Sequence, residues 1–221
     1  MNVAILNLAK ESCKKNIISK AILLHGSHAA GFANEFSDYD ILVITDNRNN
    51  EKTDAFITDG GKRIQIDFMD INELKTALDN YENMLFKQIL DLNIMAGRIL
   101  AAQILEADTE CRELIDTYRQ YRNRDALIKR FIYTATNFFN DSKTDDPLLK
   151  NHSYQMAAIN IGTAILIKNN IFWLHIKWQH RYLQKILLQE DYEDYLSIRW
   201  PQNVSEEKFL KTAKKLMKEY L

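Results

Sequence analysis

Three aspartates in the first third of the chain could do chemistry, because their spacing can bring carboxylates together. Asp38 and Asp40 stand one residue apart in SDYDILVIT at 37–45, and Asp67 stands between apolar residues in IQIDFM. Side chains alternate along a strand, so Asp38 and Asp40 project to one face. Paired, partly buried carboxylates are tolerated mainly beside a cation, a proton or an arginine. Carboxylate oxygens suit magnesium, so we expect a magnesium site here.

A Gly-Ser pair that precedes these acids could bind phosphate. If strand 63–70 lies beside strand 38–45, the three carboxylates can hold two magnesium ions about 3.5–4 Å apart, as in phosphoryl and nucleotidyl transfer. Gly26 lets the backbone approach a phosphate closely, and Ser27 adds a hydroxyl beside exposed N–H groups. A lone Gly-Ser or D-x-D pair is more often only a turn or a strand end, so the prediction depends on the combination.

The same residues resemble the signature of a known superfamily. The Gly-Ser pair at 26–27, ten further residues and the DYD triplet at 38–40, with Asp67 on a later strand, are similar to the motifs of the DNA polymerase β-type nucleotidyltransferases. The resemblance is to the small bacterial branch, which includes aminoglycoside and lincosamide nucleotidyltransferases and the minimal nucleotidyltransferases of toxin–antitoxin pairs. It covers roughly residues 20–70, and the later helical pattern resembles the family's second domain only in general.

The resemblance implies a magnesium-dependent transfer of a nucleoside monophosphate from a nucleoside triphosphate, expected to be ATP, to a hydroxyl, with release of pyrophosphate. By matching positions, Gly26 and Ser27 would hold the β- and γ-phosphates. Asp38 and Asp40 would bind the two magnesium ions. Asp67 would bind the catalytic ion and help to deprotonate the acceptor hydroxyl.

The chain departs from the family in the loop that follows the Gly-Ser pair. Members often carry basic residues there, whereas this loop reads HAAGFANEF, with His28 and no Arg or Lys before Arg48. Neutralisation of the triphosphate is therefore left to the metal ions, to His28 or to a basic residue from the helical half. Lys177 and Arg181 are candidates for that residue, although a solvated cationic face is the alternative. A further base from the helical half would be Glu113, Asp116 or Asp125.

Other polar residues near these motifs have simpler interpretations. Asp46 and Asp70 are expected to be exposed acids at strand ends, so Asp67 rather than Asp70 is the predicted third ligand. His25 is expected to be a half-buried strand residue. The acidic stretch EDYED at 190–194 is expected to be a solvated turn.

The composition is that of a globular protein without a global charge signature. The chain has 221 residues, of which 46% are apolar and 27% charged, and its net charge of -1 favours neither nucleic acid nor an anionic membrane. Two cysteines that match no zinc or redox spacing favour a reduced cytoplasm. The longest apolar run, 156–167, is interrupted by Asn160 and is too short to cross a bilayer, so we expect a buried helix and no membrane.

The apolar patterns of the first half mix helix and strand periodicities. The expected elements are, in order, a helix at 3–18, strands at 20–25, 37–45 and 61–70, and a helix at 84–95. The strands at 37–45 and 61–70 are expected to pair antiparallel. Residues 97–105 fit either a further strand or the start of the next helix.

The second half is helical almost throughout. Helical patterns cover 109–139, 150–169, 176–189 and 205–221. The polar stretch NDSKTDDP at 140–147 predicts a break, with Pro147 placed to start the next helix.

Together these patterns predict an α+β fold of two domains. A small mixed sheet flanked by helices forms a nucleotidyltransferase domain at 1–105, and an all-helical bundle follows at 106–221. The expected acceptor is a small hydroxylated molecule such as an aminoglycoside-like compound. Two alternatives stay open, which are modification of a protein or RNA, as in the toxin–antitoxin type, and a non-catalytic nucleotide-binding module.

Overall fold

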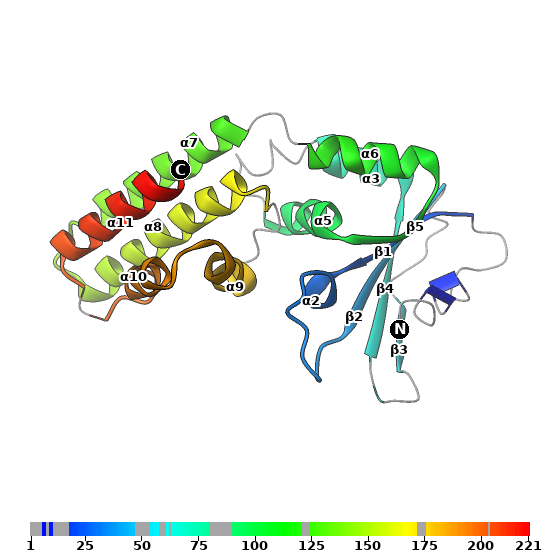
Figure 1. The fold of residues 1–221 in the computed structure, drawn as a ribbon, viewed down its shortest axis with the longest axis horizontal. Coiled ribbons are helices and arrows are strands. Elements are labelled where there is room, and N and C mark those ends of the chain that lie inside the picture. Colours follow the sequence, from blue (N-terminus) through cyan, green and yellow to red (C-terminus); the bar gives the residue numbers. More distant parts are fainter. Residues whose placement is uncertain are drawn as a thin grey trace. The chain divides into compact units, whose positions relative to one another are not determined.

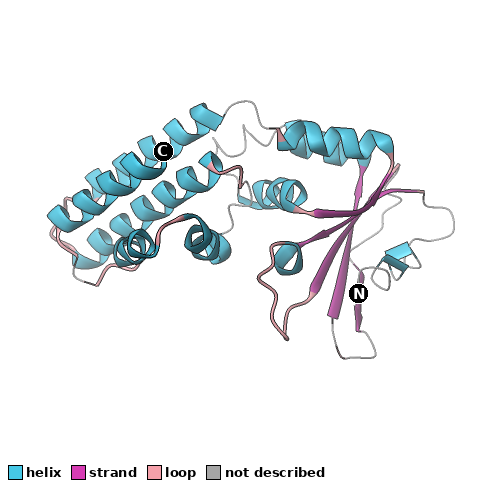
Figure 2. Cartoon of the chain, viewed as in Figure 1, coloured by secondary structure: helices cyan, strands magenta, loops and turns pink. Residues whose placement is uncertain are grey.

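The computed structural model describes residues 6–7, 9–10, 18–46, 54–57, 61, 63–79, 90–120, 124–171, 176–202 and 204–221. Contacts divide the chain into two compact units, Met1–Tyr121 and Arg122–Leu221. Among the described residues, the first unit holds a mixed sheet with helices and the second holds only helices (Figure 1 and Figure 2). This arrangement confirms the predicted α+β class, while the domain boundary near residue 105 stays a prediction.

The strands of the first unit form one mixed sheet. Their bounds are Ser19–His25 for β1, Tyr39–Thr45 for β2, Asp54–Ile57 for β3, Arg63–Asp70 for β4 and Gln103–Ala107 for β5. The described strands form a five-stranded sheet in the order β3-β4-β2-β1-β5. β2 and β4 run parallel, and the other neighbouring pairs run antiparallel.

The predicted antiparallel pairing of the two aspartate-bearing strands is wrong. β2 and β4 are parallel, with Asp40 opposite Gln65 and Leu42 opposite Asp67. The reason is β3, which pairs antiparallel with the outer edge of β4 and lies between β2 and β4 in the chain. β3 has only four residues, DAFI, which are too few to show strand alternation.

Residues 97–105, which fitted either a strand or the start of a helix, contribute to both kinds of element. Helix α5, Leu90–Ala101, is followed by β5, which pairs antiparallel with β1. Of the helix predicted at 84–95, residues 84–89 lie outside the described part of the chain. Most of the helix predicted at 3–18 also lies outside it, and residues 6–7 and 9–10 are helical.

The two faces of the sheet bury different partners. On one face, Ile41 and Val43 of β2 pack with apolar residues of β1 and β4 and with Ala9. By alternation the opposite face carries Asp40 and Leu42. Helices α3 (Ile71–Asp79), α5 and α6 (Thr109–Arg119) also contact the strands, and Figure 1 shows them beside the sheet. Asp40 therefore shares its face with buried apolar residues rather than pointing into bulk water.

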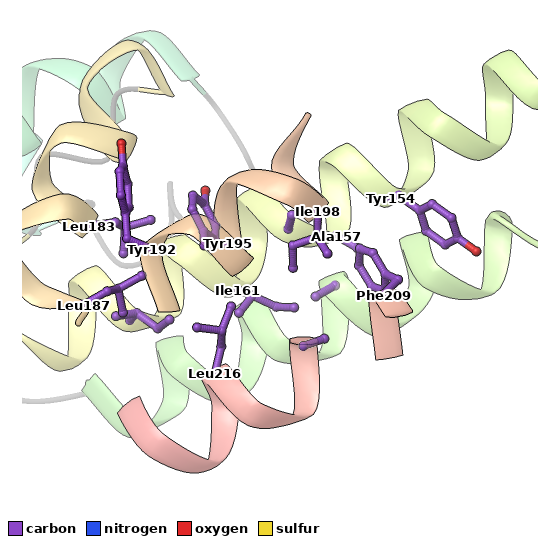
Figure 3. Close-up of a cluster of buried hydrophobic side chains, with 14 of the residues drawn as sticks. Tyr154, Ala157, Ile161, Leu183, Leu187, Tyr192, Tyr195, Ile198, Phe209 and Leu216 are labelled. Carbon is purple, nitrogen blue, oxygen red and sulfur yellow. The ribbon is translucent and has the colours of Figure 1, made fainter. Parts of the chain in front are cut away.

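The second unit is a bundle around one long helix. Its helices are α7 (Arg124–Asp141), α8 (Pro147–Lys168), α9 (Ile176–Ile186), α10 (Gln189–Arg199) and α11 (Glu206–Tyr220). α8 starts at Pro147 as predicted, and the side chain of Asp146 accepts the N–H of Leu148 at 2.8 Å. Figure 3 shows how Ile161 of α8 lies among side chains of the neighbouring helices, including Phe209 and Leu216 of α11.

The prediction of a solvated turn at 190–194 is wrong, because this stretch lies inside α10. Asp191 and Tyr192 are buried there, and Lys215 of α11 lies 2.6 Å from Asp191 Oδ1. A charged stretch can enter a helix when one acid finds a cation on a neighbouring helix, which the local sequence does not show. No helix in the described ranges is long and apolar enough to span a membrane.

Candidate active site

The glycine after β1 lies against the second aspartate of the DYD triplet. β1 ends at His25, and the one-turn helix α2, Gly26–Ala29, follows. Gly26 has a φ of +69°, and a Cβ built on it would overlap Oδ2 of Asp40 and lie 2.8 Å from its Cγ. Only glycine therefore fits here, and the backbone of the Gly-Ser turn directly faces the Asp40 carboxylate.

The loop between the Gly-Ser pair and the acids is held by its own contacts. The ring of His28 stacks on Tyr39 at 3.9 Å between centroids, and its Nε2 lies 3.3 Å from the carbonyl oxygen of Ser37. The N–H of Phe32 donates to the carbonyl of Ser27 at 2.9 Å. These contacts tie α2 to the start of β2, so they set the distance between Gly26 and the acids.

Two of the predicted acids share a face and adjacent rows of the sheet. Asp40 stands opposite Gln65 of β4, and Asp67 is two residues further along that strand, so both carboxylates lie on one side. Gln65 donates from Nε2 to both carboxylate oxygens of Asp67 at 3.4 Å. Asp38 precedes β2, its side chain is 41% exposed, and its Oδ2 lies 4.0 Å from Nη1 of Arg63.

The three acids act on one another electrostatically. Burial raises the pKa of Asp40 above its usual value, and the charges of Asp38 and Asp67 raise it further. The charge of Arg98, and to a smaller extent that of His28, opposes this and lowers the pKa. The negative charge of ionised Asp40 is therefore only partly neutralised by positive charges of the protein itself.

Comparison with known proteins identifies the family of this part of the chain. A family model described as "Polymerase beta, Nucleotidyltransferase" matches residues 7–109. This part of the chain belongs to the polymerase beta nucleotidyltransferase superfamily. Its members usually transfer nucleotidyl groups with a divalent metal ion and a nucleoside triphosphate.

Two further comparisons concern curated protein sequences and solved structures. No curated protein sequence matches the chain. Among solved structures, the chain matches the 1.90 Å crystal structure of a nucleotidyltransferase-like protein from Exiguobacterium sibiricum, with 12% identity and a TM-score of 0.49. That match covers 99% of this chain and 73% of the other.

The donor chemistry of the polymerase beta domain fits magnesium. Among the described residues, no group of three His, Cys, Asp or Glu side chains is already close enough to hold a metal ion. Asp38, Asp40 and Asp67 nevertheless supply only oxygen ligands, which magnesium prefers, and the pKa of Asp40 is raised partly by its neighbouring acids. The glycine contact leaves backbone rather than a side chain beside Asp40. These observations agree with the magnesium ligands that the sequence predicts, and that assignment stays a prediction.

The histidine before the Gly-Ser pair is more deeply buried than predicted. His25 is 1% exposed, stands opposite Asp40 in the sheet, and has no hydrogen-bond partner on either ring nitrogen among the described residues. Burial, with a contribution from Arg98, lowers its pKa to about 4, although Asp67 acts in the other direction. His25 is therefore neutral at physiological pH and adds no positive charge beside Asp40.

Sequence reasoning missed a cation of this domain. Arg98 of α5 interacts electrostatically with both Asp40 and His25, although about thirty residues separate it from Asp67, the nearest acid of the set. No motif spacing marks Arg98, because it lies in the segment that fitted either helix or strand. Only the tertiary packing of α5 on β1 brings this residue to the acids.

The other acids of the sheet lie at strand ends as the sequence predicts, although Asp70 is half-buried rather than exposed. Asp70 ends β4, and its Oδ1 accepts the N–H groups of Asn72 and Glu73 at 2.8 Å at the start of α3. Asp46 follows β2 and lies 3.1 Å from Nζ of Lys20. Both acids thus have local partners, which leaves Asp67 as the predicted third ligand.

The remaining candidates divide between the two units. Asp116 lies on α6 and pairs with Arg119 at 3.2 Å, and Glu113 lies on the same helix. Asp125 and Arg181 belong to the second unit, as does Lys177, whose Nζ lies 4.8 Å from the ring centroid of Trp178. Their predicted roles as base or phosphate ligands stay predictions.

We expect the His28→Phe variant to bind magnesium and ATP with an affinity within about threefold of the wild type. Phe keeps the aromatic stack on Tyr39 and loses only the hydrogen bond to Ser37, which costs about 0.5–1.5 kcal/mol of stability. Thermal unfolding and calorimetric titration with ATP and magnesium measure both effects. A tenfold or larger loss of affinity in a stable variant would instead show that His28 binds the triphosphate.

Proposed function

We propose that the chain is a magnesium-dependent nucleotidyltransferase that transfers a nucleoside monophosphate from ATP to a hydroxyl of a small molecule. The observation that carries this proposal is the placement of Asp40 and Asp67 on one face of the sheet, with the backbone of Gly26 directly beside Asp40. The membership of this segment in the polymerase beta superfamily supports the same reaction class.

The three carboxylates divide the work in this proposal. Asp38 and Asp40 hold the two magnesium ions, and Asp67 holds the catalytic one. Bound magnesium supplies charge neutralisation for the attacking and leaving oxygens. The N–H groups of the α2 turn and the hydroxyl of Ser27 bind the oxygens of the β- and γ-phosphates.

The reaction then needs one proton transfer and one displacement. The acceptor hydroxyl gives its proton to Asp67, and its oxygen forms a bond to the α-phosphorus. The bond from the α-phosphorus to the oxygen that bridges to the β-phosphate breaks, and pyrophosphate leaves with the electron pair. The products are the nucleotidylated acceptor and pyrophosphate.

The acceptor belongs to the proposal only as a chemical class. We propose a small hydroxylated compound, such as an aminoglycoside-like molecule, by analogy with the small bacterial branch that the motifs resemble. A protein or an RNA is the alternative acceptor, as in the toxin–antitoxin type.

We expect the full chain to release pyrophosphate from ATP with magnesium when a panel of hydroxylated small molecules is added. The Asp67→Asn variant should lose at least about a hundredfold in rate, because it removes a proton acceptor and a ligand. Asp46→Asn is the matched control, since it removes the same charge from an exposed strand-end acid. Pyrophosphate release is followed by a coupled assay, and ATP binding by calorimetry with and without magnesium.

Each outcome of this experiment decides between the candidate functions. Transfer of labelled AMP to a co-purifying protein or RNA, and to no small molecule, would establish the alternative acceptor. ATP binding without any pyrophosphate release would indicate a non-catalytic nucleotide-binding module. An absence of binding to every nucleoside triphosphate would contradict the proposal.

A further inference from the structure

Arg98 is a cation placed next to the acids by a helix outside the sequence motifs. α5 packs against β1 and α3, and residues 96–100 of this helix are mostly buried. The side chain of Arg98 is only partly exposed, and its Nε atom is buried. It lies close enough to Asp40 and His25 for its charge to act on both.

One donor of the Arg98 side chain has no hydrogen-bond partner within the described part of the chain. This donor is the Nε atom, which is buried. By contrast, Arg119, which is also in this unit, donates to the carbonyls of Leu100 and Ala102 and pairs with Asp116. A buried donor without a partner costs free energy, so an additional acceptor, such as an oxygen of a bound ligand, would stabilise this side chain.

Among the described residues, the other basic side chains that act on Asp40 or Asp38 are less suitable for binding phosphate. His25 is only 1% exposed, and the contacts of His28 to Tyr39 and Ser37 occupy its ring. Arg63 lies on the outer side of Asp38 with 57% of its side chain exposed. The positive charge of two magnesium ions does not balance the negative charge of three carboxylates and a triphosphate. The proposed reaction therefore needs a further positive charge at the sheet face that carries Asp40.

We propose that Arg98 binds the triphosphate of the nucleotide and replaces the basic residues that the loop after Ser27 lacks. This inference rests on the proposed function and adds to it a phosphate-binding residue. A guanidinium presents several N–H donors in a planar fork that matches phosphate oxygens, whereas a lysine would act only as a point charge. The same charge also compensates Asp40 in the absence of nucleotide, which accounts for its position beside this acid.

The test compares nucleotides of different phosphate number on the full chain. Calorimetric titration with magnesium is carried out for ATP, ADP and AMP on the wild type and on the Arg98→Gln and Arg98→Lys variants. Arg112→Gln is the matched control, because Arg112 is an exposed residue of α6 in the same unit. Thermal unfolding of each variant checks that it folds.

We expect Arg98→Gln to weaken ATP binding by about ten- to hundredfold, the usual loss for hydrogen bonds to a charged group. The loss should shrink from ATP to ADP to AMP, Arg98→Lys should recover part of the ATP affinity, and Arg112→Gln should bind as the wild type does. An equal loss for ATP and AMP would show a structural role, and unchanged ATP affinity in Arg98→Gln would also overturn the inference. If the wild type bound no nucleoside triphosphate, the proposed function would fail together with it.

Discussion

Replacing Asp40 with Asn is expected to abolish nucleotidyl transfer and at the same time to make the protein without ligands more stable to heat. The variant should lose about a thousandfold or more in the rate of pyrophosphate release, because it removes a carboxylate that the proposed metal site requires. Its free energy of unfolding should rise by about 1 kcal/mol, in the range found when a strained functional residue is replaced. For a chain of this size, that gain raises the melting temperature by about 2–4 °C.

The gain in stability follows from the environment of the carboxyl group. Burial raises the pKa of Asp40, Asp38 and Asp67 raise it further, and Arg98 offsets only part of this. A carboxyl with a higher pKa in the folded state than in the unfolded state stabilises the fold below its unfolded pKa. That contribution is lost as the pH rises through the folded pKa. Asn is uncharged at every pH and avoids this loss. The stability gain of Asp40→Asn over the wild type should therefore be full at neutral pH and disappear below about pH 4.

Melting temperatures measured across this pH range test the prediction, together with the pyrophosphate assay. Asp38→Asn is the matched control for stability, because the side chain of Asp38 is 41% exposed and its removal should change the melting temperature less. Addition of ATP and magnesium should raise the melting temperature of the wild type and not that of Asp40→Asn. A variant that melts below the wild type at neutral pH would show that the Asp40 carboxylate stabilises the fold.

The local patterns of the sequence were sufficient for most elements of the fold. Strand β1, the aspartate strand β2 and the helix that starts at Pro147 were all predicted from apolar periodicity and turn residues. Alternation along a strand predicted that Asp38 and Asp40 share a face, and Asp67 was expected to join them if the two strands lie side by side. The register of β2 and β4 places Asp40 and Asp67 on one face. Side chains alternate in parallel and in antiparallel pairs, so the wrong orientation does not by itself exclude that these acids share a face.

The features that the sequence did not show depend on contacts between distant segments. β3 is recognisable only through its pairing with β4. Residues 190–194 belong to α10, where Asp191 pairs with Lys215 of α11. Arg98 reaches the acids through the packing of α5 on β1, so no spacing along the chain indicates it. The depth at which His25 is buried has the same origin, since a strand residue is covered by elements that come later in the chain.

The Gly26→Ala variant is expected to lose both stability and activity. Ala at a φ of +69° costs about 1–2 kcal/mol through backbone strain alone. Its Cβ would also overlap Oδ2 of Asp40, which adds about 1–3 kcal/mol for the side chain that must move. Displacement of this carboxylate by about 1 Å should cost on the order of a hundredfold in rate.

Gly31→Ala separates the two contributions, because the two glycines differ only in what surrounds them. Gly31 has nearly the same backbone angle, a φ of +70°, and a Cβ built on it meets nothing within 4 Å. We therefore expect Gly31→Ala to lower the melting temperature by the strain alone and to keep ATP binding with magnesium and pyrophosphate release. Gly26→Ala should lower it further and lose both. Equal melting temperatures and equal activities for the two variants would mean that Asp40 moves aside without cost, and the contact between the Gly-Ser turn and this acid would then have no part in the proposed reaction.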